Sequence, residues 1–160
     1  MGLEIERKFL VLGDLPANIC GDNILQGYIL AEAGRTVRIR TVTHNDEATG
    51  YLTIKSKSSS GGLSRFEFET EIPIKDAEKL LELCSQPLIK KTRFKIEHAG
   101  FTWEIDEFHD ENAGLIMAEI ELKSETQSFD KPDFIGQEVT GDFRYFNSML
   151  QRNPYSRWSK

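Results

Sequence analysis

The stretch LEIERKFLV, residues 3–11, decides the fold because its side chains alternate between apolar and charged from Leu3 to Phe9, with Arg7 as the exception. Successive side chains of a β-strand point to opposite faces, so this stretch has one apolar face and one charged face. The charged face carries Glu4, Glu6 and Lys8. Glutamate and lysine are poor strand formers, so a strand that lines a whole face with them needs a structural reason.

Seven more stretches show the same two-residue period, and together they predict a mainly β (α+β) protein. The eight predicted strands are residues 3–11, 24–30, 35–43, 50–57, 63–72, 89–98, 101–108 and 115–124. Turn residues such as Gly34, Asn45-Asp46 and Gly61-Gly62 separate them, so most neighbours are expected to form antiparallel hairpins.

Two stretches have helical spacing instead, and one has neither period. Residues 75–85 place an apolar stripe on one side: Ala77, Leu80, Leu81 and Cys84. Residues 142–151 begin at Asp142, a suitable N-cap. Their apolar side consists of Phe143, Phe146, Met149 and Leu150. Residues 123–137 are expected to form a loop.

The charges on the predicted strands have two interpretations. On a half-buried sheet they would face solvent and form surface ion pairs, which is the common case. Here, however, like charges repeat two residues apart, about 6.7 Å along a strand. Two carboxylates at that spacing repel by roughly 2.5 kcal/mol at an effective dielectric constant near 20. The signs also segregate, with acidic pairs on the first, fifth, seventh and eighth strands and basic pairs on the others that carry charge.

A closed eight-stranded antiparallel barrel would explain both features. Closure removes the sheet edges and can turn the charged faces into one polar lumen. The apolar faces would then point outward, and the two helices could partly cover them. Lysines and arginines in the lumen would bind an anion, and carboxylates would bind a hard divalent cation, so a metal-bound polyphosphate would match both sets.

The composition argues against several classes of protein. The net charge of −6 disfavours a general nucleic-acid-binding surface, and no apolar run approaches the ~18 residues that cross a membrane. No secretory signal is recognised, and Cys20 and Cys84 lie far apart, so we expect reduced thiols in a cytoplasmic protein. The 160 residues predict a single domain, and the oligomeric state stays open, a homodimer included.

The order of these motifs resembles the CYTH, or triphosphate tunnel metalloenzyme, family. Its E-x-E-x-K signature corresponds to Glu4, Glu6 and Lys8. Further matching stretches are QGY (26–28), VRIR (37–40), LTIKSK (52–57), RFEFETEIP (65–73), KKTR (90–93), WEID (103–106), AEIEL (118–122) and VTGDFRYFNS (139–148). The resemblance implies a small-molecule triphosphate as ligand, with Mg²⁺ or Mn²⁺ as cofactor. The short chain and QGY resemble the bacterial members that hydrolyse inorganic triphosphate.

The resemblance also implies a role for each matching residue. The metal ligands would be Glu4, Glu6, Glu67, Glu69, Asp106, Glu119 and Glu121, and Glu6 and Glu69 would also be catalytic. The phosphate ligands would be Lys8, Arg38, Arg40, Lys55, Arg65, Lys91 and Arg93. Glu104 could assist Asp106. Tyr28 is a candidate catalytic residue, as a proton acceptor or water-positioning group, and packing at the barrel mouth is the alternative.

Three functions therefore compete. A metal-dependent inorganic triphosphatase is the leading hypothesis. A class IV adenylyl cyclase or a thiamine triphosphatase is the enzyme alternative, because the family contains both. A polyphosphate- or nucleotide-binding barrel is the non-catalytic alternative. The glutamates at positions 4, 6, 119 and 121 favour catalysis, because binding an anion alone needs fewer acids.

Overall fold

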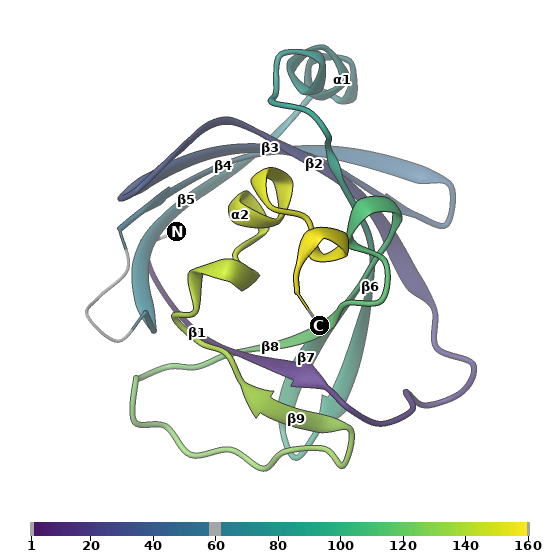
Figure 1. Ribbon diagram of the computed structural model, residues 1–160, viewed down its shortest axis with the longest axis vertical. Helices are drawn as coiled ribbons and strands as arrows, with labels where there is room; N and C mark the ends of the chain where they lie inside the picture. Colours follow the sequence, from purple (N-terminus) through teal and green to yellow (C-terminus); the bar gives the residue numbers. More distant parts are fainter. Residues whose placement is uncertain (1, 58–61, 160) are drawn as a thin grey trace.

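The computed structural model describes residues 2–57 and 62–159, and its main feature is a closed β-barrel (Figure 1). The barrel strands are β1 (Gly2–Val11), β2 (Gly21–Glu32), β3 (Arg35–His44), β4 (Glu47–Ser56), β5 (Ser64–Ile72), β6 (Ile89–His98), β7 (Phe101–Phe108) and β8 (Ile116–Glu121). They follow the order β5-β4-β3-β2-β6-β7-β8-β1, and β1 pairs again with β5. The recorded pairings are antiparallel, so the predicted eight-stranded barrel is confirmed.

The first strand closes the barrel by using its two edges differently. One edge pairs with β8 over residues 6–10. The other edge pairs with β5 only over residues 2–5, which leaves its second half open. A ninth strand, β9 (Ile135–Glu138), fills that half by pairing at Phe9 and Val11. The prediction of a loop over residues 123–137 was therefore wrong at its end, because the free half of the β1 edge recruits a strand.

Two different segments cover the apolar outer face of the barrel. Helix α1 (Ile74–Glu82) lies over β2, β3 and β4, and its own residues Ala77 and Leu81 are buried against the sheet. The helix approaches β4 closely, since a side-chain carbon on Gly50 would lie 2.6 Å from Cβ of Ala77. On another side, the segment between β8 and β9 packs Phe129 onto the buried Trp103 at 5.8 Å between ring centroids.

The predicted second helix is divided in two. A 3₁₀ turn, η2 (Phe143–Tyr145), is followed by α2 (Asn147–Arg152), and Phe146 between them is extended, with φ −66° and ψ 135°. Asp142 accepts a hydrogen bond from the N–H of Arg144, so it caps only the short turn. The expected apolar stripe was also wrong at Phe143, which is 61% exposed. The break turns Phe146 toward Lys8, whose Nζ lies 5.5 Å from the ring centroid.

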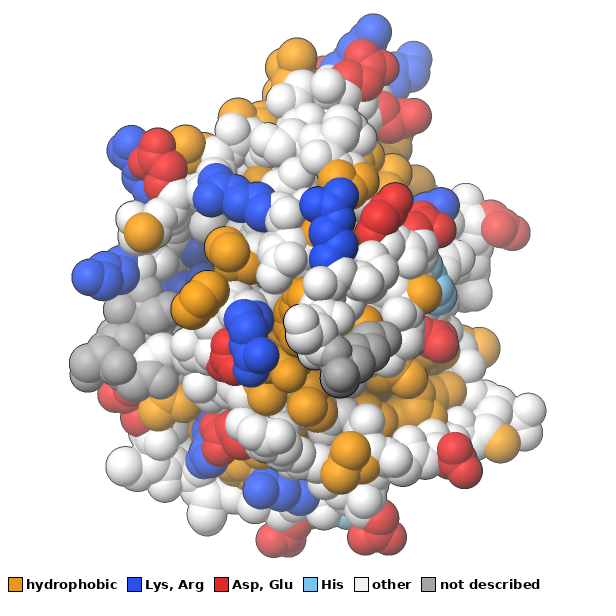
Figure 2. Space-filling model, viewed as in Figure 1, with side chains coloured by type: hydrophobic (Ala, Val, Ile, Leu, Met, Phe, Trp, Pro, Cys, Tyr) orange, Lys and Arg blue, Asp and Glu red, His pale blue; other side chains and the backbone are white. Residues whose placement is uncertain are grey.

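The divided helix closes one end of the barrel and does not cover its outer face, contrary to expectation (Figure 1). Seen from the same side, side chains of several kinds, hydrophobic ones among them, cover this end (Figure 2). The remaining 3₁₀ turns are η1 (Asp110–Asn112) and η3 (Tyr155–Arg157). Tyr145 and the fully buried Leu150 anchor the end in an apolar cluster with β6, β7 and β8 residues.

Three smaller predictions complete the comparison with the sequence. Cys20 and Cys84 are both free thiols, as predicted. No helix in the described part of the chain is long and apolar enough to cross a membrane. The turn predicted at Gly61-Gly62 lies partly outside the described residues.

Candidate active site

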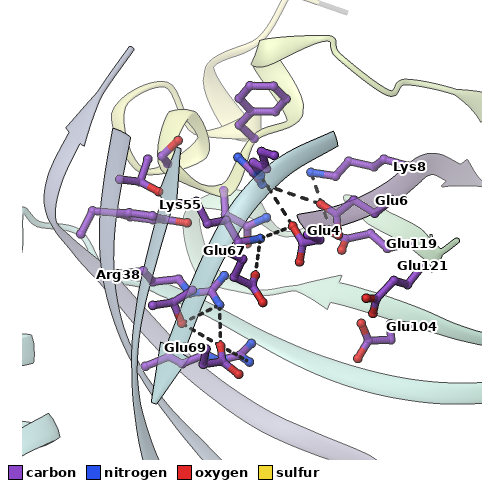
Figure 3. Close-up of a pocket in the computed structure, with 18 of the residues that line it drawn as sticks. Glu4, Glu6, Lys8, Arg38, Lys55, Glu67, Glu69, Glu104, Glu119 and Glu121 are labelled. Carbon is purple, nitrogen blue, oxygen red and sulfur yellow. Dashed lines mark hydrogen bonds and ion pairs between the residues drawn. The ribbon is translucent and has the colours of Figure 1, made fainter. Parts of the chain in front are cut away.

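The lumen contains a cavity of about 230 Å³ lined almost entirely by polar side chains (Figure 3). Its lining is Glu4, Glu6, Lys8, Tyr28, Thr36, Arg38, Arg40, Thr53, Lys55, Arg65, Glu67, Glu69, Lys91, Arg93, Glu104, Glu119, Glu121, Phe146, Asn147 and Ser148. Every residue predicted for the site borders this cavity except Asp106. The two-residue period thus identified the inward face of each strand.

Lys55 connects the acidic residues of β1 and β5. Its Nζ lies 2.9 Å from Oε1 of Glu4 and 3.2 Å from Oε2 of Glu67. Burial, opposed by Lys55, raises the pKa of Glu4 above its ordinary value. Although burial alone would raise it, hydrogen bonding to Glu4 and the charge of Lys55 lower the pKa of Glu67. The hydrogen bond between the two carboxyl groups therefore moves their pKa values in opposite directions, up for Glu4 and down for Glu67.

Glu69 on β5 gathers the two arginines of β3. Its Oε2 lies 3.5 Å from a terminal nitrogen of Arg38 and 3.3 Å from one of Arg40, and it accepts a 2.7 Å hydrogen bond from Oγ1 of Thr53. Burial, together with repulsion from Arg38 and Arg93, lowers the pKa of Arg40 to about 10. The charges of Glu69 and Glu104 thus offset burial and the neighbouring guanidinium ions only in part.

Glu6 and Glu119 lie close together on β1 and β8 and differ in protonation. Burial and the charge of Glu119 raise the pKa of Glu6 to about 8. Burial also disfavours the charge of Glu119, but Lys8 and Arg93 outweigh it and lower the pKa of Glu119 to about 2. At neutral pH the pair therefore carries about one negative charge, because two buried carboxylates without enough cations do not both ionise.

Asp106 is 2% exposed and lies behind the cavity lining. It forms a two-point ion pair with Arg93, at 2.7 and 2.9 Å, and accepts a 2.8 Å hydrogen bond from Nζ of Lys91. Burial opposes its charge, but Arg93 and Lys91 lower the pKa of Asp106 well below the ordinary value. Burial, opposed by Asp106, lowers the pKa of Lys91 to about 8.

Other charges around the cavity lack such compensation. Glu121 has no salt bridge within the described part of the chain, and burial with the charges of Glu4 and Glu104 raises its pKa. Figure 3 shows Glu104 and Glu121 side by side. Nε of Arg38 and Nε of Arg40 are buried, and neither has a hydrogen-bond partner among the described residues. These four residues, Arg38, Arg40, Glu104 and Glu121, line the same cavity.

The carboxylates suit a hard cation chemically, although their present positions do not form a finished metal site. Carboxylate oxygens are the ligands that Mg²⁺ prefers, and burial with the charge of Glu119 raises the pKa of Glu6, so a nearby cation would favour its ionised form. No group of three or more acidic, histidine or cysteine side chains in the described ranges is arranged to hold a metal ion. Several of these carboxylates instead pair with lysine or arginine.

Sequence reasoning missed five residues of the lining: Thr36, Thr53, Phe146, Asn147 and Ser148. Thr36 and Thr53 lie two residues before Arg38 and Lys55, so they share the inward faces of β3 and β4, and the strand period could have included them. The other three belong to the segment that was predicted as one continuous helix. Asn and Ser are common at helix starts, so the FNS sequence was the local signal that a second helix begins there.

The fold and the site together define a class of protein. It is a closed antiparallel barrel whose buried lumen presents lysines, arginines and carboxylates to one cavity, suited to a polyanion accompanied by hard cations. Residues 2–149 match the CYTH domain, and the chain belongs to the CYTH family.

Relatives of known name support this assignment. An inorganic triphosphatase of Acetivibrio thermocellus is 50% identical over 162 aligned residues and covers 100% of both chains. An inorganic triphosphatase of Nitrosomonas europaea is 33% identical, over 92% of this chain and 95% of its own. The crystal structure of the inorganic triphosphatase NE1496 has a TM-score of 0.65 at 30% identity, covering 92% of this chain and 93% of that one.

Proposed function

We propose that this protein hydrolyses inorganic triphosphate to diphosphate and phosphate, with Mg²⁺ or Mn²⁺ as cofactor. The observation that carries the proposal concerns Arg38 and Arg40, which line the cavity and whose buried Nε donors have no hydrogen-bond partner among the described residues. Buried polar groups are normally paired, so such donors indicate a missing anionic partner. The name of the 50% identical relative supports the same substrate.

The charge of the lining supports a metal-bound substrate. The described lining holds seven glutamates and seven lysines or arginines, so its formal charges balance. A linear triphosphate would add several negative charges, which divalent cations would offset. We place these cations on Glu4, Glu6, Glu119 and Glu121, with Glu67 and Glu69 as further ligands. Bound there, a divalent cation supplies charge neutralisation and activation of water.

The basic residues would bind and orient the phosphates. Arg38, Arg40 and Lys55 surround the cavity from β3 and β4, and Lys8 and Arg93 do so from β1 and β6. Phosphate ligation would release Lys55 from Glu4 and so free that carboxylate for the cation. The basic groups neutralise charge on the transferred phosphoryl group, as phosphoryl transfer requires. Arg65 and Lys91 are assigned to the same set.

Asp106 receives a different role in this proposal from the one expected of it. Both of its oxygens are occupied by Lys91 and Arg93, and it is not part of the cavity lining. We therefore propose that Asp106 holds the side chains of Lys91 and Arg93 in place and does not bind a metal ion.

The substrate would be selected by phosphate contacts alone. Tyr28 and Phe146 are the aromatic residues among the described lining, and the ring of Phe146 already faces Lys8. No cluster of aromatic and amide groups for a nucleobase is apparent in that lining. The proposal therefore ranks inorganic triphosphate above ATP and above thiamine triphosphate.

The free cysteines support the cytoplasmic location expected from the sequence.

Phosphate release from inorganic triphosphate, ATP and thiamine triphosphate, at equal Mg²⁺ and at equal Mn²⁺, tests this function. We expect the highest kcat/KM with inorganic triphosphate and no turnover in excess EDTA. Equal or greater efficiency with ATP, or cyclic AMP as product, would instead indicate the cyclase. Binding of triphosphate without phosphate release would indicate the non-catalytic barrel.

The metal assignment is tested separately by Glu121→Gln. This variant should lose at least about 100-fold in kcat, because a charged ligand is removed, while the metal-free protein melts at the same or a higher temperature. Glu71→Gln is the matched control, since Glu71 lies on a barrel strand but is exposed and outside the cavity lining. Full activity of Glu121→Gln would refute the assignment.

A further inference from the structure

The segment that closes the barrel end, residues 143–152 (the closing segment), also enters the cavity. Phe146, Asn147 and Ser148 border the cavity at the start of α2. The segment is held from behind by two anchors. Leu150 is fully buried in the apolar cluster, and Nε2 of Gln151 donates a 2.8 Å hydrogen bond to the carbonyl of Gln86. The residues at the start of α2 that border the cavity are therefore held in place from behind by Leu150 and Gln151.

Asn147 is the residue of this segment with the most specific contacts to the lumen. Its Oδ1 accepts a hydrogen bond from Nζ of Lys91 at 2.9 Å and another from Nε2 of Gln26 at 3.0 Å. Lys91 and Gln26 come from β6 and β2, two adjacent barrel strands. One oxygen atom of the closing segment thus joins two strands that carry predicted site residues.

The chemistry of lysine fixes the orientation of both amides. An ammonium group only donates, so Asn147 must present its carbonyl oxygen, and not its NH₂ group, to Lys91. That same oxygen faces Gln26, so Gln26 must in turn present its NH₂ group. A rotation of either amide by 180° would set like groups against each other, so Lys91 determines the whole arrangement.

Two residues of the proposed active site are oriented as a result. Lys91 is held between Oδ2 of Asp106 at 2.8 Å and Oδ1 of Asn147, which leaves one of its three N–H bonds for a ligand. Nε2 of Gln26 also donates to the hydroxyl of Tyr28 at 3.4 Å. The tyrosine hydroxyl accepts that bond, so its own proton is available to an oxygen in the cavity.

We propose that Asn147 is a positioning residue, which aims the third N–H of Lys91 and the hydroxyl proton of Tyr28 at phosphate oxygens of the substrate. The start of α2, which borders the cavity, thereby belongs to the binding site, whereas the rest of the closing segment only holds it in place. This inference rests on the proposed function, because it assigns both groups to a triphosphate.

A double-mutant cycle between Asn147→Leu and Lys91→Met tests the proposal, because coupled residues give non-additive effects. Asn147→Leu keeps the approximate size and removes the acceptor. We expect it to lower kcat/KM for inorganic triphosphate by about 10-fold or more, as for a hydrogen bond to a charged group. In the Lys91→Met background, Asn147→Leu should lower kcat/KM by less than about threefold, since the ammonium group that Asn147 positions is already absent. Asn147→Ala replaces Asn147→Leu if the latter does not fold.

Gln151→Leu is the matched control for loosening of the closing segment. It removes an anchor of the same helix without touching the cavity. We expect a lower melting temperature and an unchanged kcat/KM. Additive effects in the cycle, or an equal loss of kcat/KM in Gln151→Leu, would overturn the role of Asn147 while wild-type turnover keeps the proposed function standing.

A second readout separates failure of the proposed function from failure of this inference. The dissociation constant for inorganic triphosphate, measured by calorimetry in EDTA, should show the same non-additive pattern without turnover. A wild-type protein that binds triphosphate but releases no phosphate would refute the hydrolysis alone. A wild-type protein that neither binds triphosphate in the presence of Mg²⁺ or Mn²⁺ nor hydrolyses it would refute both proposals.

Discussion

Two parts of the same lumen treat buried charge in opposite ways. Around Asp106, each charge has a partner within the protein, because Lys91 and Arg93 occupy both carboxylate oxygens. Around Arg38 and Arg40, the charges share one carboxylate and two Nε donors remain unpartnered among the described residues. Both oxygens of Asp106 are therefore occupied without a ligand, although Lys91 keeps one N–H for a ligand, whereas the donors of Arg38 and Arg40 are not all occupied. The filled Asp106 carboxylate therefore indicates a structural role, and the unfilled donors indicate a binding role.

Removing the charge of Asp106 should have the largest effect, which is on the free energy of unfolding. Asp106→Ala would leave Lys91 and Arg93 buried without their counter-charge, which typically destabilises a protein by about 3–5 kcal/mol. Urea denaturation of the metal-free protein measures this loss of unfolding free energy. Asp130→Ala, at an exposed position, is the control and should change it by less than about 0.5 kcal/mol. A loss below about 1 kcal/mol for Asp106→Ala would contradict the structural role.

Removing the charge of Arg38 should weaken substrate binding without lowering the stability of the fold. Arg38→Met removes charge-assisted hydrogen bonds to phosphate, worth about 1.5–3 kcal/mol, so KM for triphosphate should rise roughly 10- to 100-fold. The melting temperature should not fall, because Arg38 repels Arg40. Arg35→Met, on the same strand but exposed, is the control for kinetics. An unstable Arg38→Met protein with normal KM would reverse the comparison.

A smaller effect concerns stability against pH on the acidic wall. The folded protein holds a proton on Glu6 up to about pH 8, whereas an unfolded glutamate releases it near 4.5. Between these values the folded state binds more protons, so stability falls as pH rises. Glu6→Gln removes this loss and should raise the metal-free melting temperature at pH 7.5 relative to wild type by several degrees, with little effect at pH 5.

Exposed Glu78→Gln is the control for that experiment and should show no such pH-dependent difference. Added Mg²⁺ or Mn²⁺ should sharpen the result, because a bound cation would stabilise ionised Glu6 and remove the advantage of glutamine. An advantage of Glu6→Gln that is equal at pH 5 and pH 7.5 would show that Glu6 does not hold the extra proton.

The sequence by itself determined which strand residues share a face. The side-chain period of a strand is two, so residues such as Glu4, Arg38 and Lys55 had to share inward faces once the barrel closed. The strand bounds at 89–98 and 101–108 agree with the structure for the same reason. These are local properties, fixed by backbone geometry and by the apolar pattern of each strand.

Only the tertiary structure decided which charges are satisfied. Asp106 and Glu119 have the same alternating pattern as Glu6 and Glu121, yet contacts from other strands hold the first two ionised and leave the latter two with raised pKa values. The break at Phe146, the strand β9 and the contacts of Asn147 also depend on segments distant in the chain. A local pattern fixes the face on which a residue lies, but its protonation and partners depend on what the folded chain brings beside it.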